Sequence, residues 1–307
     1  MMFLLLFLLG QVHAQDLAAL FRPGPSGHTA LIRQQFYGNA QVPGSNRRLQ
    51  HREWQGRVNG TLWSNDSWEM TGGIDAQDLV WHHPSPVLNP YRNFQGTVGA
   101  RRFSGQNQVR GFNLSYGSAS DRPFARAAND TASANYVHQF NERWWGLVNW
   151  SNNRLFLNNV PLPGVFYVSK MTREETLMFG FPAIFWRKRW QSGFEGMYFS
   201  FLPYNHRAYV GWFWNADHGV LLSYTHAPQV FFRDERVSKR ERVFFIENKA
   251  MIEIQGTIIP RHLQWQVGVG TAFNRRVYEA KNFQEDKRFD VPLGDTWLAS
   301  AQLTAQF

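Results

Sequence analysis

The segment that closes the chain, 297–307, alternates strictly between apolar and mostly polar side chains. One face carries Trp297, Ala299, Ala301, Leu303, Ala305 and Phe307, and the other carries Leu298, Ser300, Gln302, Thr304 and Gln306. Because successive side chains of a β-strand point to opposite sides, this pattern predicts a strand that separates two different environments. A half-buried edge strand would alternate in the same way, so the rest of the chain has to decide.

Many other segments show the same alternation. Segment 262–274 points Leu263, Trp265, Val267, Val269 and Phe273 to one side, and 243–256 does the same with Phe244, Ile246, Ala250, Ile252 and Ile254. Further candidates are 29–37, 51–64, 68–80, 93–103, 108–117, 131–140, 143–152, 175–186, 189–201, 206–215 and 218–227. The chain is therefore predicted to be all-β, an antiparallel transmembrane β-barrel of about fourteen strands, with twelve as the alternative count.

The predicted connections alternate between short and long. The short ones are 64–67, 104–107, 141–142, 187–188, 215–218 and 257–261, and the long ones are 38–50, 81–92, 118–130, 153–174, 228–242 and 275–295. The connection near Pro203 is an exception, because its position requires a long loop and it is short. Outer-membrane barrels have short periplasmic turns and long extracellular loops, whereas a sandwich has no reason to sort its loops by end. We expect one barrel domain, 15–307, with both of its ends in the periplasm.

The beginning of the chain predicts export. Residues 3–10 form a short apolar run, and Val12-His13-Ala14 is a small-x-small cleavage signature. Residues 1–14 are therefore predicted to be a secretory signal peptide, since a membrane-spanning helix needs about 20 apolar residues. No Lys or Arg precedes the run, which a start site assigned slightly late would explain.

Composition excludes several classes of protein. The chain contains no cysteine, so disulfide frameworks and thiol chemistry are excluded. Its mean hydropathy of −0.42 suits a barrel, because only alternate residues of each strand meet lipid. The net charge of +9 could indicate nucleic acid, but export separates the chain from nucleic acid. Lipopolysaccharide phosphates are the better-placed partner, and a generally basic surface is the simpler interpretation.

Aromatic residues make up 16 % of the chain, more than a core requires. Many tryptophans lie beside predicted short turns, which is typical of the aromatic girdle at a membrane interface. The predicted interfacial aromatics are Trp63, Trp68, Trp144, Trp145, Trp186, Trp190, Trp212 and Trp214, and Phe140 lies next to the predicted turn at 141–142.

The polar faces of the strands predict the contents of a lumen. The charges expected to face it are Arg57, Glu69, Asp75, Arg101, Glu195, Arg207, Glu247, Lys249 and Glu253, with Asn59 among the neutral groups. Both signs are present, so we expect these charges to pair with one another across the lumen. A pore selective for one sign would show an excess of that sign, and the set shows none.

Candidate catalytic and metal-binding residues are few. Ser223 and His226 are close in sequence, but an odd offset places them on opposite faces of a strand. His82-His83 opens a predicted loop, yet adjacent residues diverge in extended chain, and no metal-ligand spacing follows. In the loop 228–242, Arg233, Arg236, Lys239, Arg240 and Arg242 are mixed with acidic residues, which favours a solvated loop over a phosphate-binding patch. We expect no catalytic residues, no metal and no cofactor.

The closing strand resembles that of bacterial outer-membrane barrels, in which a terminal aromatic residue forms part of the signal read by the assembly machinery. The resemblance gives this role to Trp297, Leu303, Ala305 and Phe307. With its leader ending His13-Ala14, the segment Phe179-Gly180-Phe181-Pro182 and the final Ala-Gln-Phe307, the chain resembles an outer-membrane barrel family catalogued as a domain of unknown function. It is more loosely similar to barrels associated with type IX secretion, although Asn89-Pro90-Tyr91 only partly matches their Asn-Pro-Ala motif.

These observations leave three functions for a Gram-negative outer-membrane protein. The first is a passive, porin-like pore for small solutes or lipids. The second is a non-conducting scaffold, adhesion or secretion subunit that binds a partner through its loops, above all 153–174 and 275–295. The third is an outer-membrane enzyme, which the residues do not favour.

Overall fold

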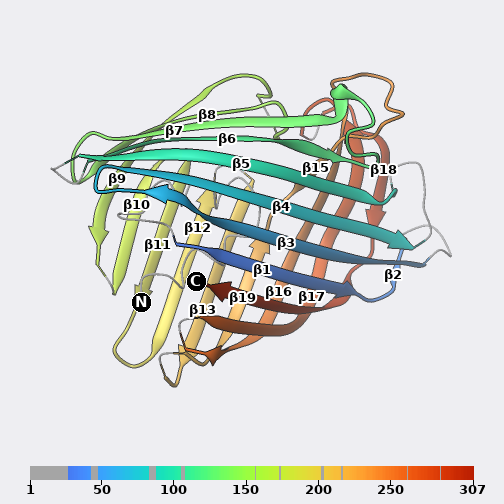
Figure 1. The fold of residues 1–307 in the computed structure, drawn as a ribbon. Coiled ribbons are helices and arrows are strands. Elements are labelled where there is room, and N and C mark those ends of the chain that lie inside the picture. Colours follow the sequence, from blue (N-terminus) through green and yellow to red (C-terminus); the bar gives the residue numbers. More distant parts are fainter. Residues whose placement is uncertain are drawn as a thin grey trace.

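The fold is taken from a computed structural model, which describes residues 27–307 except 43–47, 83–87, 105–107, 156, 173, 202–203, 216, 261 and 284. The predicted signal peptide and its cleavage site lie outside the described residues. Sixteen of the described strands form one closed antiparallel barrel (Figure 1). They are β1 (Thr29–Tyr37), β3 (Arg48–Ser64), β4 (Trp68–His82), β5 (Tyr91–Ser104), β6 (Gln108–Ser120), β7 (Asp130–Gln139), β8 (Trp144–Ser151), β9 (Leu162–Met171), β10 (Glu175–Phe181), β11 (Ala183–Arg189), β12 (Phe194–Phe201), β13 (Asn205–Phe213), β14 (Gly219–His226), β16 (Arg242–Ile259), β17 (Leu263–Ala280) and β19 (Thr296–Gln306).

Three shorter strands lie outside this ring of sixteen: β2 (Ala40–Gln41), β15 (Gln229–Phe231) and β18 (Arg288–Leu293). A 3-10 turn, η2, covers Ala127–Asn129. In the part of the chain that is described, no helix is long and apolar enough to cross a membrane.

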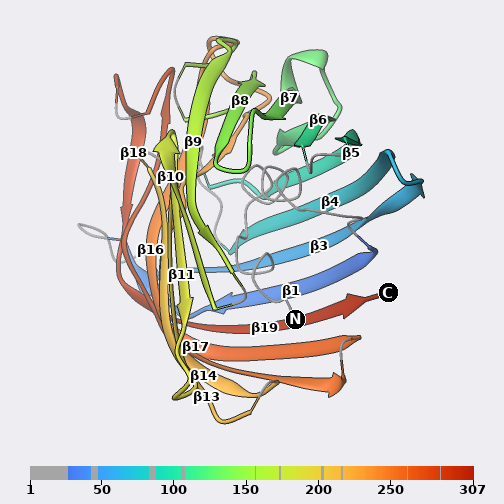
Figure 2. The same ribbon diagram turned by 90° about the vertical axis from the view of Figure 1, so that its left-hand side faces the viewer.

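The first and last strands close the barrel. β1 pairs with β3 on one side and with β19 on the other, from Thr29 opposite Gln306 to Tyr37 opposite Leu298. Figure 2 shows β1 and β19 side by side, with the C-terminus at their edge. The prediction that the closing strand pairs with the weak first strand near 29–37 is confirmed, so neither strand is left with an unpaired edge.

The predicted count of about fourteen strands is wrong, because two strands were missed in one region. The predicted loop 153–174 contains β9, and the predicted strand 175–186 is two strands, β10 and β11, joined by Pro182 alone. The alternation fails here because both faces are apolar. Phe179 and Phe181 are exposed outside the barrel, while Met178 and Phe185 pack against an apolar cluster inside it. The turn predicted at 187–188 lies instead at 190–193.

The wall strands β1, β3, β4, β5 and β16 have an apolar outer face and an inner face that is polar for much of its length. On β4, Ile74 is 66 % exposed and points outward, whereas the next residue, Asp75, is buried inside. Val58, Val98, Val210, Leu222, Ile252 and Val269 are exposed on other strands in the same way. So large an exposed apolar surface is stable only when water is kept away from it.

The two ends of the barrel differ. At one end, here called the short-turn end, the connections are 65–67, 105–107, 140–143, 172–174, 190–193, 214–218 and 260–262, and Phe307 lies there beside His28. The opposite, long-loop end has 38–47, 83–90, 121–129, 152–161, 227–241 and 281–295, but only Pro182 and 202–204 over β10 to β13. The predicted sorting of loops is confirmed, including the short connection near Pro203, and Pro182 is an exception that was not predicted. Since β10 and β11 have 7 residues each and β16 and β17 have 18, the rim is lowest over β10 and β11.

Candidate functional site: the barrel lumen

The structure places all nine predicted lumen charges on the inner face of the wall. Arg57, Glu69, Asp75, Arg101, Glu195, Arg207, Glu247 and Glu253 are buried there, and Lys249 is nearly so. Three of their ion pairs differ from the predicted pairing across the lumen, because they run along the wall between neighbouring strands. Arg57 bonds Asp75 at 2.6 Å, Arg187 bonds Glu195 at 2.8 Å, and Arg101 bonds Glu69. Neighbouring strands are only about 5 Å apart, so their side chains meet without crossing the lumen. Lys249 of β16 instead lies 3.5 Å from Glu53 of β3, with β17, β19 and β1 between the two strands.

The middle of the lumen holds a second network around Glu247 on β16. Its carboxylate accepts hydrogen bonds from the Tyr37 hydroxyl at 2.8 Å and from Lys249 Nζ at 2.7 Å. Arg275 lies 3.4 Å from the same carboxylate and also contacts His51, whose ring stacks on Tyr37 at 3.6 Å. This network joins β1, β3, β16 and β17 on the inner face of one wall.

Several charges that face the lumen were not among the predicted set. Arg275 was assigned to a loop, but β17 continues to Ala280, and a bulge near Asn274, with φ of 50°, turns Arg275 inward. Arg187 was assigned to a turn. Glu53 lies on the same face of β3 as Arg57, and Arg33 lies on the inner face of β1, but neither was among the predicted lumen charges. A bulge shifts the alternation by one residue, so counting every second residue fails beyond it.

An apolar cluster occupies the lumen near the short-turn end. It is built from inward residues of β6 to β14, including Val137, Phe166, Met197 and Leu221. Trp145 belongs to it and is 4 % exposed, whereas Trp144 is 45 % exposed on the outside. The assignment of Trp145 to the interfacial girdle is therefore wrong, because adjacent residues of a strand face opposite sides.

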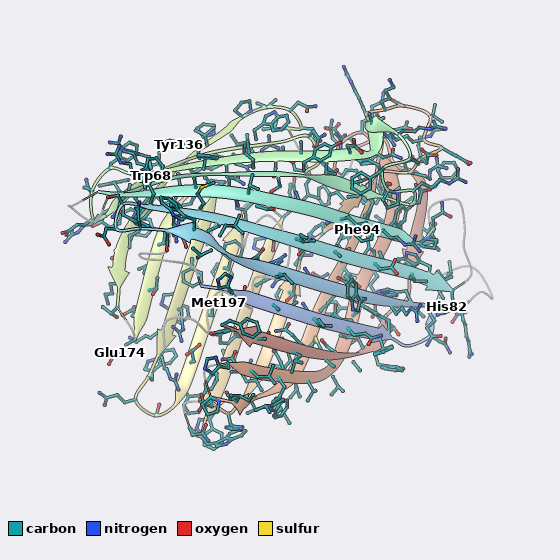
Figure 3. The ribbon with its side chains drawn as sticks, viewed as in Figure 1. Trp68, His82, Phe94, Tyr136, Glu174 and Met197 are labelled. Atoms are coloured by element: carbon teal, nitrogen blue, oxygen red, sulfur yellow. The ribbon has the colours of Figure 1, made fainter. Side chains whose placement is uncertain are left out.

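The other predicted interfacial aromatics lie on the outer surface toward the short-turn end. Trp63, Trp68, Trp144, Trp190, Trp212 and Trp214 are exposed, and Trp186 is half-buried with its ring 6.2 Å from that of Trp190. Figure 3 labels Trp68 and His82 at the two ends of β4, with the tryptophan at the short-turn end. Trp297, Leu303 and Phe307 of the predicted assembly signal are also exposed on the outside, and Ala305 is half-buried.

The segment 227–241, here called the strap, crosses the mouth of the barrel at the long-loop end. Its β15 pairs with β16, and the next residue, Phe232, forms a bridge with Ser120 at the end of β6. Around the barrel, β17, β19, β1, β3, β4 and β5 separate these strands on one side and β7 to β14 on the other. The strap therefore connects nearly opposite walls.

Side-chain contacts hold the strap in this position. Arg236 donates hydrogen bonds to Asn129 Oδ1 and to the carbonyl of Ala128, both at 2.6 Å, and Arg233 pairs with Glu279 at 2.7 Å. Burial lowers the pKa of the Arg236 guanidinium below its usual value. The prediction that 228–242 is a solvated loop is thus partly wrong. Arg233, Arg236 and Arg242 donate hydrogen bonds to residues outside this segment, whereas Lys239 and Arg240 are exposed.

Apolar packing fills part of the region beneath the strap. Phe231 of β15 stacks on Tyr91 with ring centroids 5.0 Å apart, and both are fully buried. They belong to a second apolar cluster with Leu79 and Trp81 of β4 and Phe245 of β16. The predicted loop 275–295 also differs, because 275–280 lie in β17 and β18 pairs with it.

Three cavities lined by described residues lie between these packed regions. The outer cavity, about 160 Å³, lies under the strap and is lined by Gln77, Asn153, Tyr204 and Gln229 among others. The middle cavity, about 30 Å³, shares Gln77 and Gln229 with it. The inner cavity, about 40 Å³, shares Arg33, Arg207, Thr225 and Lys249 with the middle one. The three cavities therefore follow one another from the long-loop end into the lumen.

One hydrogen bond stands between the outer and the middle cavity. Gln77 Nε2, on the wall, donates to Gln229 Oε1, on the strap, at 3.0 Å. At the far side, the inner cavity borders Met197, Tyr209 and Leu221 of the apolar cluster. A polar contact of the strap thus lies between the outer and the middle cavity, and the apolar cluster near the short-turn end borders the inner cavity.

The structure places Ser223 and His226 in different surroundings. Ser223 lines the inner cavity and donates to Glu253 at 2.6 Å, while His226 bonds Asn248 and does not line that cavity. Within the described ranges, no group of three or more His, Cys, Asp or Glu side chains could hold a metal ion.

No protein-family profile matches the chain, and no curated protein matches it significantly. Solved structures resemble it in shape at low identity. The COG4313 outer membrane channel from Pseudomonas putida F1 shares 7 % identity, with 92 % of this chain and 96 % of that chain covered and a TM-score of 0.42. The Pseudomonas putida toluene transporter TodX shares 10 % identity, with 94 % of this chain and 93 % of that chain covered and a TM-score of 0.42. The Acinetobacter baumannii outer membrane protein Omp33 shares 7 % identity, with 93 % of this chain and 100 % of that chain covered and a TM-score of 0.40. The assignment as a barrel rests on the strand pairing of this chain.

Proposed function

We propose that this protein is an integral outer-membrane β-barrel that conducts small solutes along the three cavities of its lumen, with the strap as the gate. The observation that carries the proposal is the shared lining of successive cavities inside a closed wall. A wall packed only for stability would have no reason to leave cavities in sequence, since interiors are normally filled.

The outer surface supports the membrane part of the proposal. Exposed Ile74, Val98 and Val269 need an apolar surrounding, and exposed tryptophans gather toward one end of the barrel. The short-turn end, which holds Phe307, would face the periplasm, and the strap would face the outside with lipopolysaccharide around it. The assembly machinery of the outer membrane is the expected partner during biogenesis.

The strap is suited to control access because its own residue separates two cavities. Gln229 lines the outer and the middle cavity and accepts the hydrogen bond of Gln77. Moving the strap would break this bond and the bridge between Phe232 and Ser120. The apolar cluster near the short-turn end would then be the remaining barrier.

A cysteine lock tests the proposal directly, because the chain contains no cysteine of its own. Ser120→Cys combined with Phe232→Cys places two thiols on bridged residues, close enough for a disulfide to form. In planar bilayers we expect single-channel currents from the original chain and from the reduced variant, and loss of current on oxidation. Equal currents before and after oxidation would exclude the strap as the gate.

A non-conducting scaffold is the second candidate, favoured by the apolar cluster that fills part of the lumen. Folded barrel that migrates differently in boiled and unboiled gel samples, yet carries no current even after Arg236→Gln, would favour the scaffold over the channel.

A further inference from the structure

The inner cavity is surrounded by more positive than negative charge. Arg33, Arg207 and Lys249 line it, and Glu253 is the only carboxylate among its described lining residues. The lumen charges taken together show no excess of one sign, so this local excess of positive charge is seen only at the inner cavity. Several of the other charges form ion pairs along the wall. The cavity lies between β1, β13, β16 and β17, at mid-depth in the barrel.

The three cations differ in how they are already engaged. Lys249 bonds Glu247 at 2.7 Å and Gln35 at 2.8 Å, outside the inner cavity. Arg207 lies in the fields of Glu253 and of Arg33. Arg33 itself has no ion pair within 4.0 Å among the residues that the structure describes. The cavity thus contains a cation whose charge is not neutralised by direct contact.

A neutral donor of the cavity also lacks an acceptor. Gln266 is buried, and its Nε2 has no hydrogen-bond partner in the described part of the chain. A buried N–H without an acceptor is unfavourable, so such a group indicates a missing partner. Glu253 makes no hydrogen bond with this donor, and its carboxylate accepts the hydroxyl of Ser223 at 2.6 Å. What the cavity lacks is an acceptor that carries negative charge.

We propose that the inner cavity binds a small monovalent anion, held by Arg33 and Gln266, and that this site makes the path selective for anions. The selectivity rests on the proposed channel function, whereas the binding site does not. A volume of about 40 Å³ has room for an ion such as chloride, since a cavity needs only about 10–15 Å³ to hold one water. Rings of basic side chains select anions in other pores by the same electrostatics.

The selectivity test measures the reversal potential of the full chain in a gradient of potassium chloride. We expect a potential of the sign that chloride produces. Arg33→Gln should lower the chloride-to-potassium permeability ratio by about threefold or more, because one charge about 7 Å away changes an ion's energy by roughly RT even in water. Arg33→Lys should retain most of the ratio.

Arg110→Gln is the matched control, because Arg110 is exposed on the outside and the change in net charge is the same. Gln266→Met provides a second variant that leaves all charges in place and should weaken the anion preference as well. An unchanged ratio in Arg33→Gln, or an equal fall in Arg110→Gln, would overturn the selectivity while leaving the channel intact.

Absence of current would contradict the channel but would leave the site to be tested by itself. For that purpose, crystals of the full chain in bromide should show an anomalous peak next to Arg33 and Gln266, and crystals of Arg33→Gln should not. No bromide at this position in the original chain would overturn the anion site.

Discussion

The backbones of His28 and Phe307 exchange two hydrogen bonds across the seam of the barrel, with N···O distances of 3.2 and 3.0 Å. They continue the register of β1 and β19 by one residue at the short-turn end. The last residue of the chain therefore completes the seam, and its ring is exposed on the outer surface.

Deletion of Phe307 is expected to impair assembly, because it removes both seam bonds and the terminal aromatic ring. The fraction of protein in the outer membrane and the mobility of unboiled samples on gels report the effect. Phe307→Tyr keeps the bonds and a ring and should assemble normally. Normal insertion of the truncated chain would contradict the prediction.

The neighbours Trp144 and Trp145 should respond differently to the same substitution. Trp145→Ala opens a space in the apolar cluster and should lower the free energy of unfolding by about 3–5 kcal/mol. Trp144→Ala leaves the cluster intact and should cost clearly less. Denaturant unfolding in micelles measures both, and equal losses would contradict the assignment of the two faces.

Breaking the buried pair between Arg187 and Glu195 should also destabilise the barrel. Arg187→Met keeps the side-chain volume but leaves a buried carboxylate, which costs about 3–5 kcal/mol. Adding Glu195→Leu should recover much of the loss, because both changes then suit the neighbouring apolar cluster. Arg276→Met is the control: it breaks a more exposed pair with Asp290 and should cost less than about 1 kcal/mol. Similar losses for the two arginines would refute this.

The contacts of Arg236 predict how the strap opens. Arg236→Gln removes the charge that bonds Asn129 and Ala128, so it should increase the open probability in bilayer recordings. Lys239→Gln removes the same charge from an exposed position of the strap and should leave recordings unchanged. If both variants behave like the original chain, the strap is held by other contacts.

Much of the wall could be predicted, because the side to which each residue points depends only on its position along its own strand. Lipid-facing and lumen-facing positions alternate with period two, so Ile74 and Asp75 could be assigned to opposite sides from sequence alone. The prediction failed where contacts with neighbouring strands changed the alternation of polar and apolar residues. Inside β10 and β11 an apolar cluster replaces polar lining, and at Asn274 a bulge shifts the alternation.

The sequence by itself determined that the chain forms an antiparallel β-barrel with an apolar exterior, charged inner faces and a seam between its first and last strands. Only the tertiary structure decided that there are sixteen strands, that the strap reaches from β16 to β6, and that Arg33 and Gln266 meet at one cavity. The physical reason is distance along the chain. Alternation is a local property of each strand, whereas the strap and the cavity join residues that only closure of the barrel brings together.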